Sequence, residues 1–304
     1  MTDHASDTPD DTAGGPLAGL LTALDLTDTG ARTSEDISTG PSQWMPMGRV
    51  FGGQVLAQSL VAAMRTTEAD RRVHSMHGYF LRPGDVTKPI TFSVDRIHDG
   101  RSFSTRRTQA YQDGRPILSM IASFQDADEG LEHQAPMPEG IPQPEELPSA
   151  HDVLSRIEHP VAKHWANDRP FDMRHVEQPV YFGAAEERVA HQAVWIRAIG
   201  RLPDDPAVHL ASMAYASDYS ILESIYRRHG LSWATPGIKT ASLDHAMWFH
   251  RFGRADEWML YVQESTSAQG GRGLSLGRIY SRDGVLLASV AQEGMVRVPA
   301  EARG

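Results

Sequence analysis

The sequence predicts an α+β protein that contains two copies of one unit, each an antiparallel sheet wrapped around a central helix. Three observations support this prediction. Each half contains a helical pattern followed by several strand-like runs. The last two runs of each half are joined by an Asp-Gly turn, Asp113-Gly114 and Asp283-Gly284, which favours a tight hairpin. An acidic, proline-rich stretch separates the halves, so we expect an internal pseudo-dimer.

The 304 residues carry a formal net charge of −10, which is unevenly distributed. Residues 1–15 hold four acidic side chains and residues 126–150 hold seven, with no Lys or Arg in either segment. The remainder is nearly neutral and lacks the massed basic residues that nucleic-acid binding requires. No apolar run approaches the roughly 18 residues that span a bilayer. The absence of cysteine excludes disulfides and thiolate metal sites and fits a reducing compartment, so we expect a cytoplasmic protein.

The same composition suggests four segments. Residues 1–15 are expected to be a disordered acidic tail, and residues 16–128 the N-terminal unit. Residues 129–165 are expected to be an acidic, proline-rich linker, because prolines among like charges resist compact packing. Residues 166–304 are then the C-terminal unit.

In the first half, leucines at positions 17, 20, 21 and 24 follow helical spacing and predict a short helix from Pro16. A second helix is expected from Phe51 to Met64, with Leu56 and Leu60 on one face. Four strands should follow; these are residues 77–81, 90–97, 103–111 and 117–124.

In the second half, one helix is expected across Leu210 to Arg228, and Gly230 is a typical helix stop. Four strands should follow this helix as well; these are residues 242–249, 258–264, 274–280 and 285–296. The order of elements therefore repeats that of the first half.

Two short motifs match known patterns of catalytic or metal-binding sites but do not indicate such a site here. Gly273 to Gly277 reads G-x-S-x-G, but a nucleophile elbow needs a helix after the serine, and here the alternating pattern continues as a strand. His74 and His77 are spaced H-x-x-H, yet a strand would direct them to opposite faces. We therefore expect no metal site and no serine nucleophile at these positions.

Asp218 and Gln292 are polar residues in apolar surroundings. Asp218 lies between Met213 and Leu222, where a carboxylate is costly unless it is hydrogen-bonded. Composition alone favours a position on the solvated side of the helix. Gln292, however, is a lone amide that ends an apolar strand, whereas the first half has Gln54 and Ala122 at the aligned positions. The carboxylate–amide pair thus occurs in one half only, as expected if one repeat carries the chemistry.

Five segments, in order and in spacing, resemble the acyl-CoA thioesterase II family, over roughly residues 16–125 and 205–297. They are Phe51-Gly52-Gly53-Gln54, Tyr215-Ala216-Ser217-Asp218, Ser242 to Arg251, Glu264 to Ala268, and Asp283-Gly284 with Gln292-Glu293-Gly294. The resemblance implies a double hotdog fold, which agrees with the repeat. It also implies hydrolysis of fatty acyl-CoA to free fatty acid and coenzyme A, with no metal or redox cofactor.

The resemblance further implies a catalytic trio of aspartate, threonine and glutamine around a water molecule. Asp218 and Gln292 match two members, and Ser242 stands at the threonine position, where it keeps the hydroxyl and lacks the methyl group. Asp244 would share a strand face with Ser242 and is a rival for the carboxylate role.

Substrate contacts are expected at the start of the first-half helix and at arginines. The backbone N–H of Gly53 is a candidate donor to the developing oxyanion, and Gln54 follows it. Arg106 and Arg272 are candidates for the coenzyme A phosphates. Arg101, Arg107 and Arg278 are further candidates, although each could equally be a solvated side chain of a strand or hairpin.

Two alternatives remain open, a hotdog-fold enoyl-CoA hydratase and a non-catalytic acyl-CoA sensor. A hydratase would need an Asp/His pair, and a sensor would be expected to lack a member of the trio. We also expect a homo-oligomer, because exposed sheets of double hotdogs commonly associate. The acyl chain length depends on the depth of a tunnel, which the sequence does not define.

Overall fold

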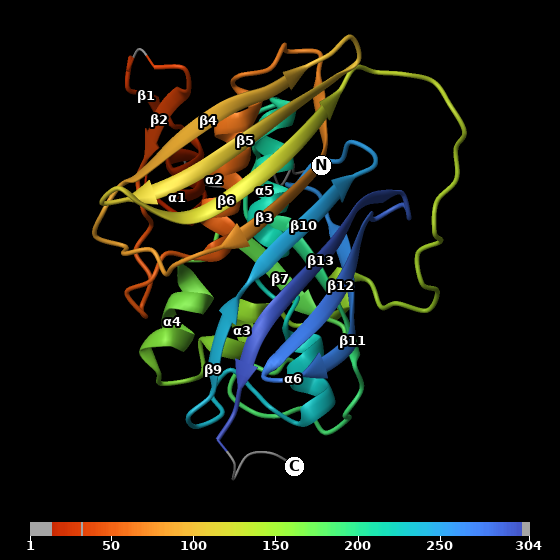
Figure 1. The fold of residues 1–304 in the computed structure, drawn as a ribbon. Helices are drawn as coiled ribbons and strands as arrows, with labels where there is room; N and C mark the ends of the chain where they lie inside the picture. Colours follow the sequence, from red (N-terminus) through yellow and green to blue (C-terminus); the bar gives the residue numbers. More distant parts are fainter. Residues whose placement is uncertain (1–13, 32, 300–304) are drawn as a thin grey trace, which may run out of the picture.

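A computed structural model describes residues 14–31 and 33–299 (Figure 1). Of the predicted acidic tail, residues 1–13 lie outside these ranges. The strands within them form one 13-stranded antiparallel sheet, in the order β1-β2-β4-β5-β6-β3-β10-β13-β12-β11-β8-β7, with β9 paired to β13. The order is nearly palindromic about the β3–β10 junction, so the predicted repeat is confirmed in the topology.

The first repeat contributes five long or medium strands and a short edge strand. They are β1 (Thr27–Asp28), β2 (Asp36–Gly40), β3 (Arg72–Phe80), β4 (Ile90–Asp99), β5 (Phe103–Gln112) and β6 (Arg115–Gln125). The β5–β6 hairpin turns at Asp113 and Gly114, both at positive φ, as the Asp-Gly pair predicts.

The second repeat mirrors this arrangement. Its strands are β7 (Phe171–His175), β8 (His191–Ala198), β9 (Lys239–Ser242), β10 (Asp244–Phe249), β11 (Met259–Gln269), β12 (Arg272–Ser281) and β13 (Leu286–Arg297). The serine of the G-x-S-x-G motif, Ser275, lies inside β12 as predicted, where its hydroxyl contacts that of Ser224.

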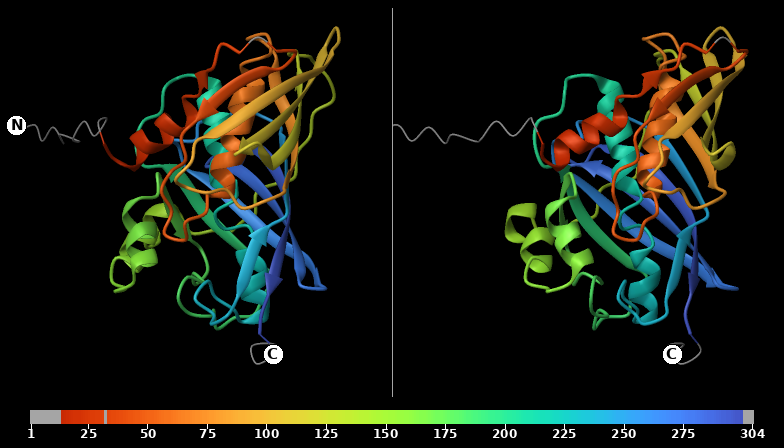
Figure 2. Two further views of the ribbon diagram at one scale, coloured as in Figure 1. Left: turned by 60° about the vertical axis from the view of Figure 1, so that its left-hand side comes forward. Right: turned by 90° about the vertical axis from the view of Figure 1, so that its left-hand side faces the viewer.

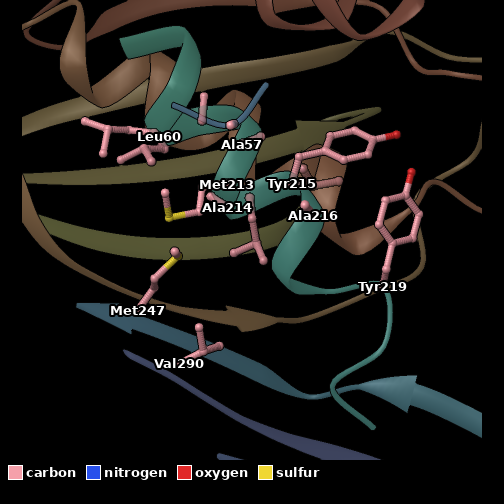
Figure 3. Close-up of a cluster of buried hydrophobic side chains, with 14 of the residues drawn as sticks. Ala57, Leu60, Met213, Ala214, Tyr215, Ala216, Tyr219, Met247 and Val290 are labelled. Carbon is pink, nitrogen blue, oxygen red and sulfur yellow. The ribbon is translucent and has the colours of Figure 1, made fainter. Parts of the chain in front are cut away.

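The helices lie on one side of the sheet (Figure 2). They are α1 (Pro16–Leu24), α2 (Gly52–Met64), α3 (Ala150–Leu154), α4 (Pro160–Asn167), α5 (Pro206–Ser217) and α6 (Glu223–His229), with a 3₁₀ turn at Pro144–Glu146. Helix α2 packs against α5 at the centre of the molecule, and Figure 3 shows Leu60 of α2 near Met213 of α5, above Met247 and Val290 of the sheet. None of the helices in the described ranges is long and apolar enough to cross a membrane.

The single helix expected over residues 210–228 is wrong. Helix α5 ends at Ser217, and α6 begins only at Glu223. Between them the N–H of Tyr219 bonds the carbonyl of Ala216 and that of Glu223 bonds Ser220, so the chain tightens into turns. Asp218 therefore stands just beyond a helix end, where its carboxylate is not confined to a helix face. Gly230 closes α6 at positive φ, as predicted.

The acidic segment after β6 is not extended throughout, because α3 and most of α4 lie within residues 129–165. Its middle part packs on the second repeat. Pro142 accepts a hydrogen bond from Trp195 Nε1 (2.9 Å), Pro136 accepts one from Tyr280 (3.1 Å), and Glu145 pairs with Arg282 (2.8 Å). Glu132 and Glu145 thus pair with Arg251 and Arg282 of the second repeat, and the exact segment boundaries remain a prediction.

Candidate active site

Three side chains predicted as a trio contact one another in the structure. Gln292 Nε2 donates to Asp218 Oδ1 (2.9 Å) and to Ser242 Oγ (3.0 Å), and Ser242 Oγ donates to Asp218 Oδ1 (3.1 Å). Ser242 is the last residue of β9, which pairs with β13 so that Ser242 faces Gly294. This pairing places the serine hydroxyl next to Gln292, while the α5–α6 turn supplies Asp218.

The buried carboxyl of Asp218 is a weaker acid than that of an exposed aspartate. Burial raises the pKa of its carboxyl to about 6, although hydrogen bonds from Gln292, Ser242 and the Gly53 N–H lower the pKa. The tyrosines that face Asp218, at positions 215, 219 and 261, have their pKa values raised by burial and stay uncharged. Asp218 is therefore ionised at neutral pH yet basic enough to accept a proton.

The first repeat supplies the other wall of the site through the amino end of α2. A Cβ added at Gly52 would lie 2.6 Å from Asp218 Oδ2, and one at Gly53 would lie 2.2 Å from the carbonyl oxygen of Tyr215. Only glycine allows the two chains to approach this closely. Because the Gly53 N–H hydrogen-bonds to Asp218, its partner is the carboxylate, whereas the sequence suggested a substrate oxyanion.

His245 also belongs to this cluster, although it was not among the site residues predicted from the sequence. Its Nδ1 hydrogen-bonds to Gln292 Oε1, and its Nε2 lies 3.0 Å from Ser217 Oγ. Burial lowers the pKa of His245 to about 4, so the ring is neutral. The available signal was its alternation with Met247 and Phe249, which places it on the buried face of β10.

Asp244, the rival carboxylate, lies elsewhere. It accepts a hydrogen bond from the backbone N–H of Glu293 (2.7 Å), and in the register between β10 and β3 it lies opposite Tyr79. The structure brings Asp218, and not Asp244, into contact with Ser242 and Gln292.

Arg106 does not suit a phosphate. It is 2% exposed, and its guanidinium donates to Asp99 (2.7 Å), to the hydroxyl and carbonyl of Thr66, and to the carbonyls of His98 and Thr105. Thr66 follows the carboxyl end of α2, whereas the trio lies at its amino end, about 20 Å away at 1.5 Å per residue. This part of the sequence prediction is wrong because a strand's alternation did not reveal which arginine would be enclosed.

Gln54 and Arg272 likewise have other partners. Gln54 is fully buried and joins the loop before α2, accepting from Gln43 N–H and donating to Pro41 O and Gln58 Oε1. Arg272 is exposed and pairs with Glu293 at 3.0 Å, at a separate hollow near the β11–β12 turn. Neither residue contacts the trio.

A pocket of about 350 Å³ opens beside the trio. Gly52 and Ser242 line it, together with the apolar side chains of Val55, Phe80 and Ile117, and Arg49 and Arg82 also lie in its wall. The Arg49 guanidinium has no hydrogen bond or ion pair with any residue that the structure describes. The pocket thus combines an apolar interior, the trio's hydroxyl and an unpaired cation.

Comparisons with known proteins agree with this arrangement. A family model described as "Acyl-CoA thioesterase" matches residues 161–295, and one described as "Acyl-CoA thioesterase N-terminal domain" matches residues 41–125. The chain is 39% identical to human acyl-coenzyme A thioesterase 8 over 276 residues, covering 87% of this chain and 85% of that protein. It is 37% identical to acyl-CoA thioesterase 2 of Haemophilus influenzae, covering 86% and 92%.

Solved structures give the same result. An acyl-CoA thioesterase II from Mycobacterium marinum is 39% identical, covers 93% of this chain and 98% of its own, and superposes with a TM-score of 0.72. A protein from Alicyclobacillus acidocaldarius described as having a hot dog fold is 20% identical, covers 93% and 99%, and gives a TM-score of 0.75, which supports the double hotdog fold. The chain belongs to the acyl-CoA thioesterase family.

Proposed function

We propose that the protein hydrolyses acyl-CoA to a free fatty acid and coenzyme A, by attack of a water molecule that the trio of Asp218, Ser242 and Gln292 activates. The observation that carries this proposal is the closed hydrogen-bond triangle of these side chains beside a pocket that Gly52 and Ser242 line. Family membership supports the reaction class.

The geometry suits general-base attack by water. Asp218 accepts a proton from water while the water oxygen bonds to the thioester carbon, which gives a tetrahedral intermediate. The C–S bond then breaks, and the thiolate of coenzyme A takes the proton from Asp218. Because the Gly53 N–H is engaged by the carboxylate, we assign the oxyanion contact to the N–H of Gly52 at the positive end of α2.

Arg49 and Arg82 replace Arg106 and Arg272 as the proposed contacts to coenzyme A phosphates. Both side chains are exposed and border the pocket that reaches Ser242. The guanidinium of Arg82 donates one hydrogen bond, to the carbonyl of Pro116 (2.8 Å), which leaves its other N–H groups for an anion. The apolar lining of Val55, Phe80 and Ile117 suits the uncharged part of the substrate.

The two alternatives fit less well. A hydratase would need its histidine beside the substrate, but His245 is buried behind Gln292 and both ring nitrogens have partners. A non-catalytic sensor would not require the raised pKa of Asp218.

Assembly and location are further parts of the proposal. We propose a homo-oligomer, because Tyr79, Ile121 and Trp248 expose apolar surface on neighbouring strands of one sheet. A cytoplasmic location fits the absence of cysteine.

The test is hydrolysis of acyl-CoAs from short to long chain, with released thiol detected by a thiol reagent. The protein has no cysteine and so adds no thiol background. Wild type should turn over, and Asp218→Asn should lose at least about 1,000-fold in kcat, because it removes the base. Tight binding of acyl-CoA without turnover of any chain length would contradict the enzyme proposal and favour the sensor.

A further inference from the structure

Gln292 acts in the trio through the orientation of its amide. Both amide hydrogens on Nε2 are used, one toward Asp218 Oδ1 (2.9 Å) and one toward Ser242 Oγ (3.0 Å). An ionised carboxylate only accepts hydrogen bonds. If the amide turned by half a rotation, its oxygen would face the carboxylate oxygen, and both donors would point away from the trio.

Shape alone does not select between these two orientations, because the oxygen and nitrogen ends of an amide are nearly equal in size. The choice depends on the partner behind Gln292. That partner is His245, whose Nδ1 hydrogen-bonds to Gln292 Oε1. A proton on Nδ1 satisfies the amide oxygen and disfavours the turned orientation, in which donor would face donor.

The second ring nitrogen does not by itself fix the tautomer, because the Ser217 hydroxyl lies 2.9 Å from the carbonyl oxygen of Ala214 and 3.0 Å from Nε2 and has one proton to donate; the proton on Nδ1 is set by its contact with the Gln292 amide oxygen. With the proton on Nδ1, Nε2 of the neutral ring is an acceptor, and Ser217 Oγ lies 3.0 Å from it. Ser217 is the last residue of α5 and directly precedes Asp218. The chain Ser217–His245–Gln292 therefore connects the turn that carries the carboxylate with the amide that binds it.

We propose that His245 is a positioning residue for thioester hydrolysis, whose Nδ1–H holds the Gln292 amide in the orientation that donates to Asp218 and Ser242. This inference rests on the proposed function of the trio. His245 has no hydrogen bond to Asp218 or Ser242 within the described residues, so it acts through Gln292.

The first repeat offers an internal comparison. Met76 of β3 pairs with Ala122 of β6. In the second repeat Ala246 pairs with Ala291, and one step further in this register His245 faces Gln292. The polar pair thus occurs only in the repeat that carries the trio. Burial also keeps the imidazole ring of His245 neutral, since it lowers the pKa of His245 to about 4.

The experiment compares His245→Met with His245→Asn. Methionine stands at the equivalent position of the first repeat and removes the donor, whereas asparagine retains an N–H close to the position of Nδ1. We expect His245→Met to lower kcat about 10- to 100-fold with KM within about threefold, as for other residues that orient active-site groups. We expect His245→Asn to recover kcat to within about threefold of wild type. Equal losses in the two variants, or no loss in His245→Met, would overturn the proposal.

A double-mutant cycle separates this inference from the proposed function. If His245 acts through Gln292, the double variant His245→Met/Gln292→Ala should be no slower than Gln292→Ala alone. Independent, multiplying losses would overturn the positioning role. Wild-type turnover by Gln292→Ala would instead refute the proposed trio. Melting temperatures show whether each variant folds, and His250→Met, at an exposed site beyond β10, is the matched control.

Discussion

The two repeats share one sheet plan but bury different residues at the same place in their central strands. The first repeat has Met76 opposite Ala122, and the second has His245 beside Gln292. The first repeat in turn supplies Gly52 and Gly53 at the amino end of α2, against which Asp218 packs. The second repeat thus carries the polar side chains, and the first repeat supplies the glycine backbone that packs closely against Asp218. The proposed site therefore needs both repeats.

The outer faces of the sheet differ as well. In the second repeat, Met137, Ile141 and Leu147 of the acidic segment pack on a cluster that includes Trp195 and Tyr280. In the first repeat, Tyr79 and Ile121 remain 64% and 46% exposed. The outer faces of the two repeats therefore differ in exposure, because the acidic segment can cover only one of these two equivalent faces.

The largest expected effect comes from the contribution of the first repeat. Gly53→Ala would place a Cβ 2.2 Å from the carbonyl oxygen of Tyr215, and backbone cannot move as a flexible side chain can. We expect a loss of about 3 kcal/mol in the free energy of unfolding, at the upper end for overpacking. Turnover should fall too, because α2 must move away from Asp218. Urea unfolding and the thiol assay measure the two effects.

The matched control for this glycine is Gly130→Ala, whose Cβ would meet nothing within 4 Å. Its unfolding free energy should stay within about 0.5 kcal/mol of wild type. If Gly53→Ala is equally harmless, the close packing of the two repeats at the site is not what the structure indicates.

A substitution in the second repeat, Asp218→Asn, should instead raise the free energy of unfolding. The pKa of Asp218 is raised from 3.8 to about 6 in the folded protein, so folding favours the protonated form. Stability from this group is present below about pH 4 and is lost as pH rises through about 6. Asp218→Asn should therefore be more stable than wild type at pH 8 by about 1–3 kcal/mol, since one pKa unit corresponds to about 1.4 kcal/mol. Chemical denaturation at both pH values measures this, and the gain should vanish at pH 4.

The pH profile tests the same carboxyl through activity. With a pKa of about 6, Asp218 loses its function as a base below that pH. The value of kcat/KM should therefore fall about tenfold per unit on the acid side. Gln292→Ala removes a donor that lowers the pKa, so its acid limb should move to higher pH. An unchanged midpoint in this variant would mean that Gln292 does not stabilise the ionised carboxylate.

The smallest effect is expected at the arginines. Arg49→Ala should raise KM for acyl-CoA about three- to tenfold at low salt with little change in kcat, because a surface cation adds binding but not chemistry. Arg272→Ala, which removes an exposed ion pair remote from the pocket, should leave KM unchanged. A raised KM in Arg272→Ala, with an unchanged KM in Arg49→Ala, would instead support the phosphate contact that the sequence predicted at Arg272.

Local patterns predicted most elements, but contacts between distant residues were harder to predict. Alternation and the Asp-Gly turns predicted the four strands that follow the central helix of each repeat, and Gly230 marked the end of α6, but the strands β2, β7 and β8 were not predicted. The break at Asp218 was missed, because apolar residues continue on both sides and the turn is stabilised by tertiary contacts. Arg106 was misassigned because nothing near it in sequence shows that Thr66 and Asp99 would enclose its guanidinium.

The sequence by itself determined the repeat and the order of most of its elements along the chain, because periodicity and turn chemistry act over a few neighbouring residues. Asp218 and Gln292 stood out as polar residues in apolar surroundings, and Ser242 was indicated by the family resemblance. Only the tertiary structure decided that Gly53 faces Asp218, that His245 stands behind Gln292, and that the carboxyl has a raised pKa. These properties arise where chains from both repeats exclude water around one carboxylate, and burial of that kind depends on contacts between residues far apart in the chain.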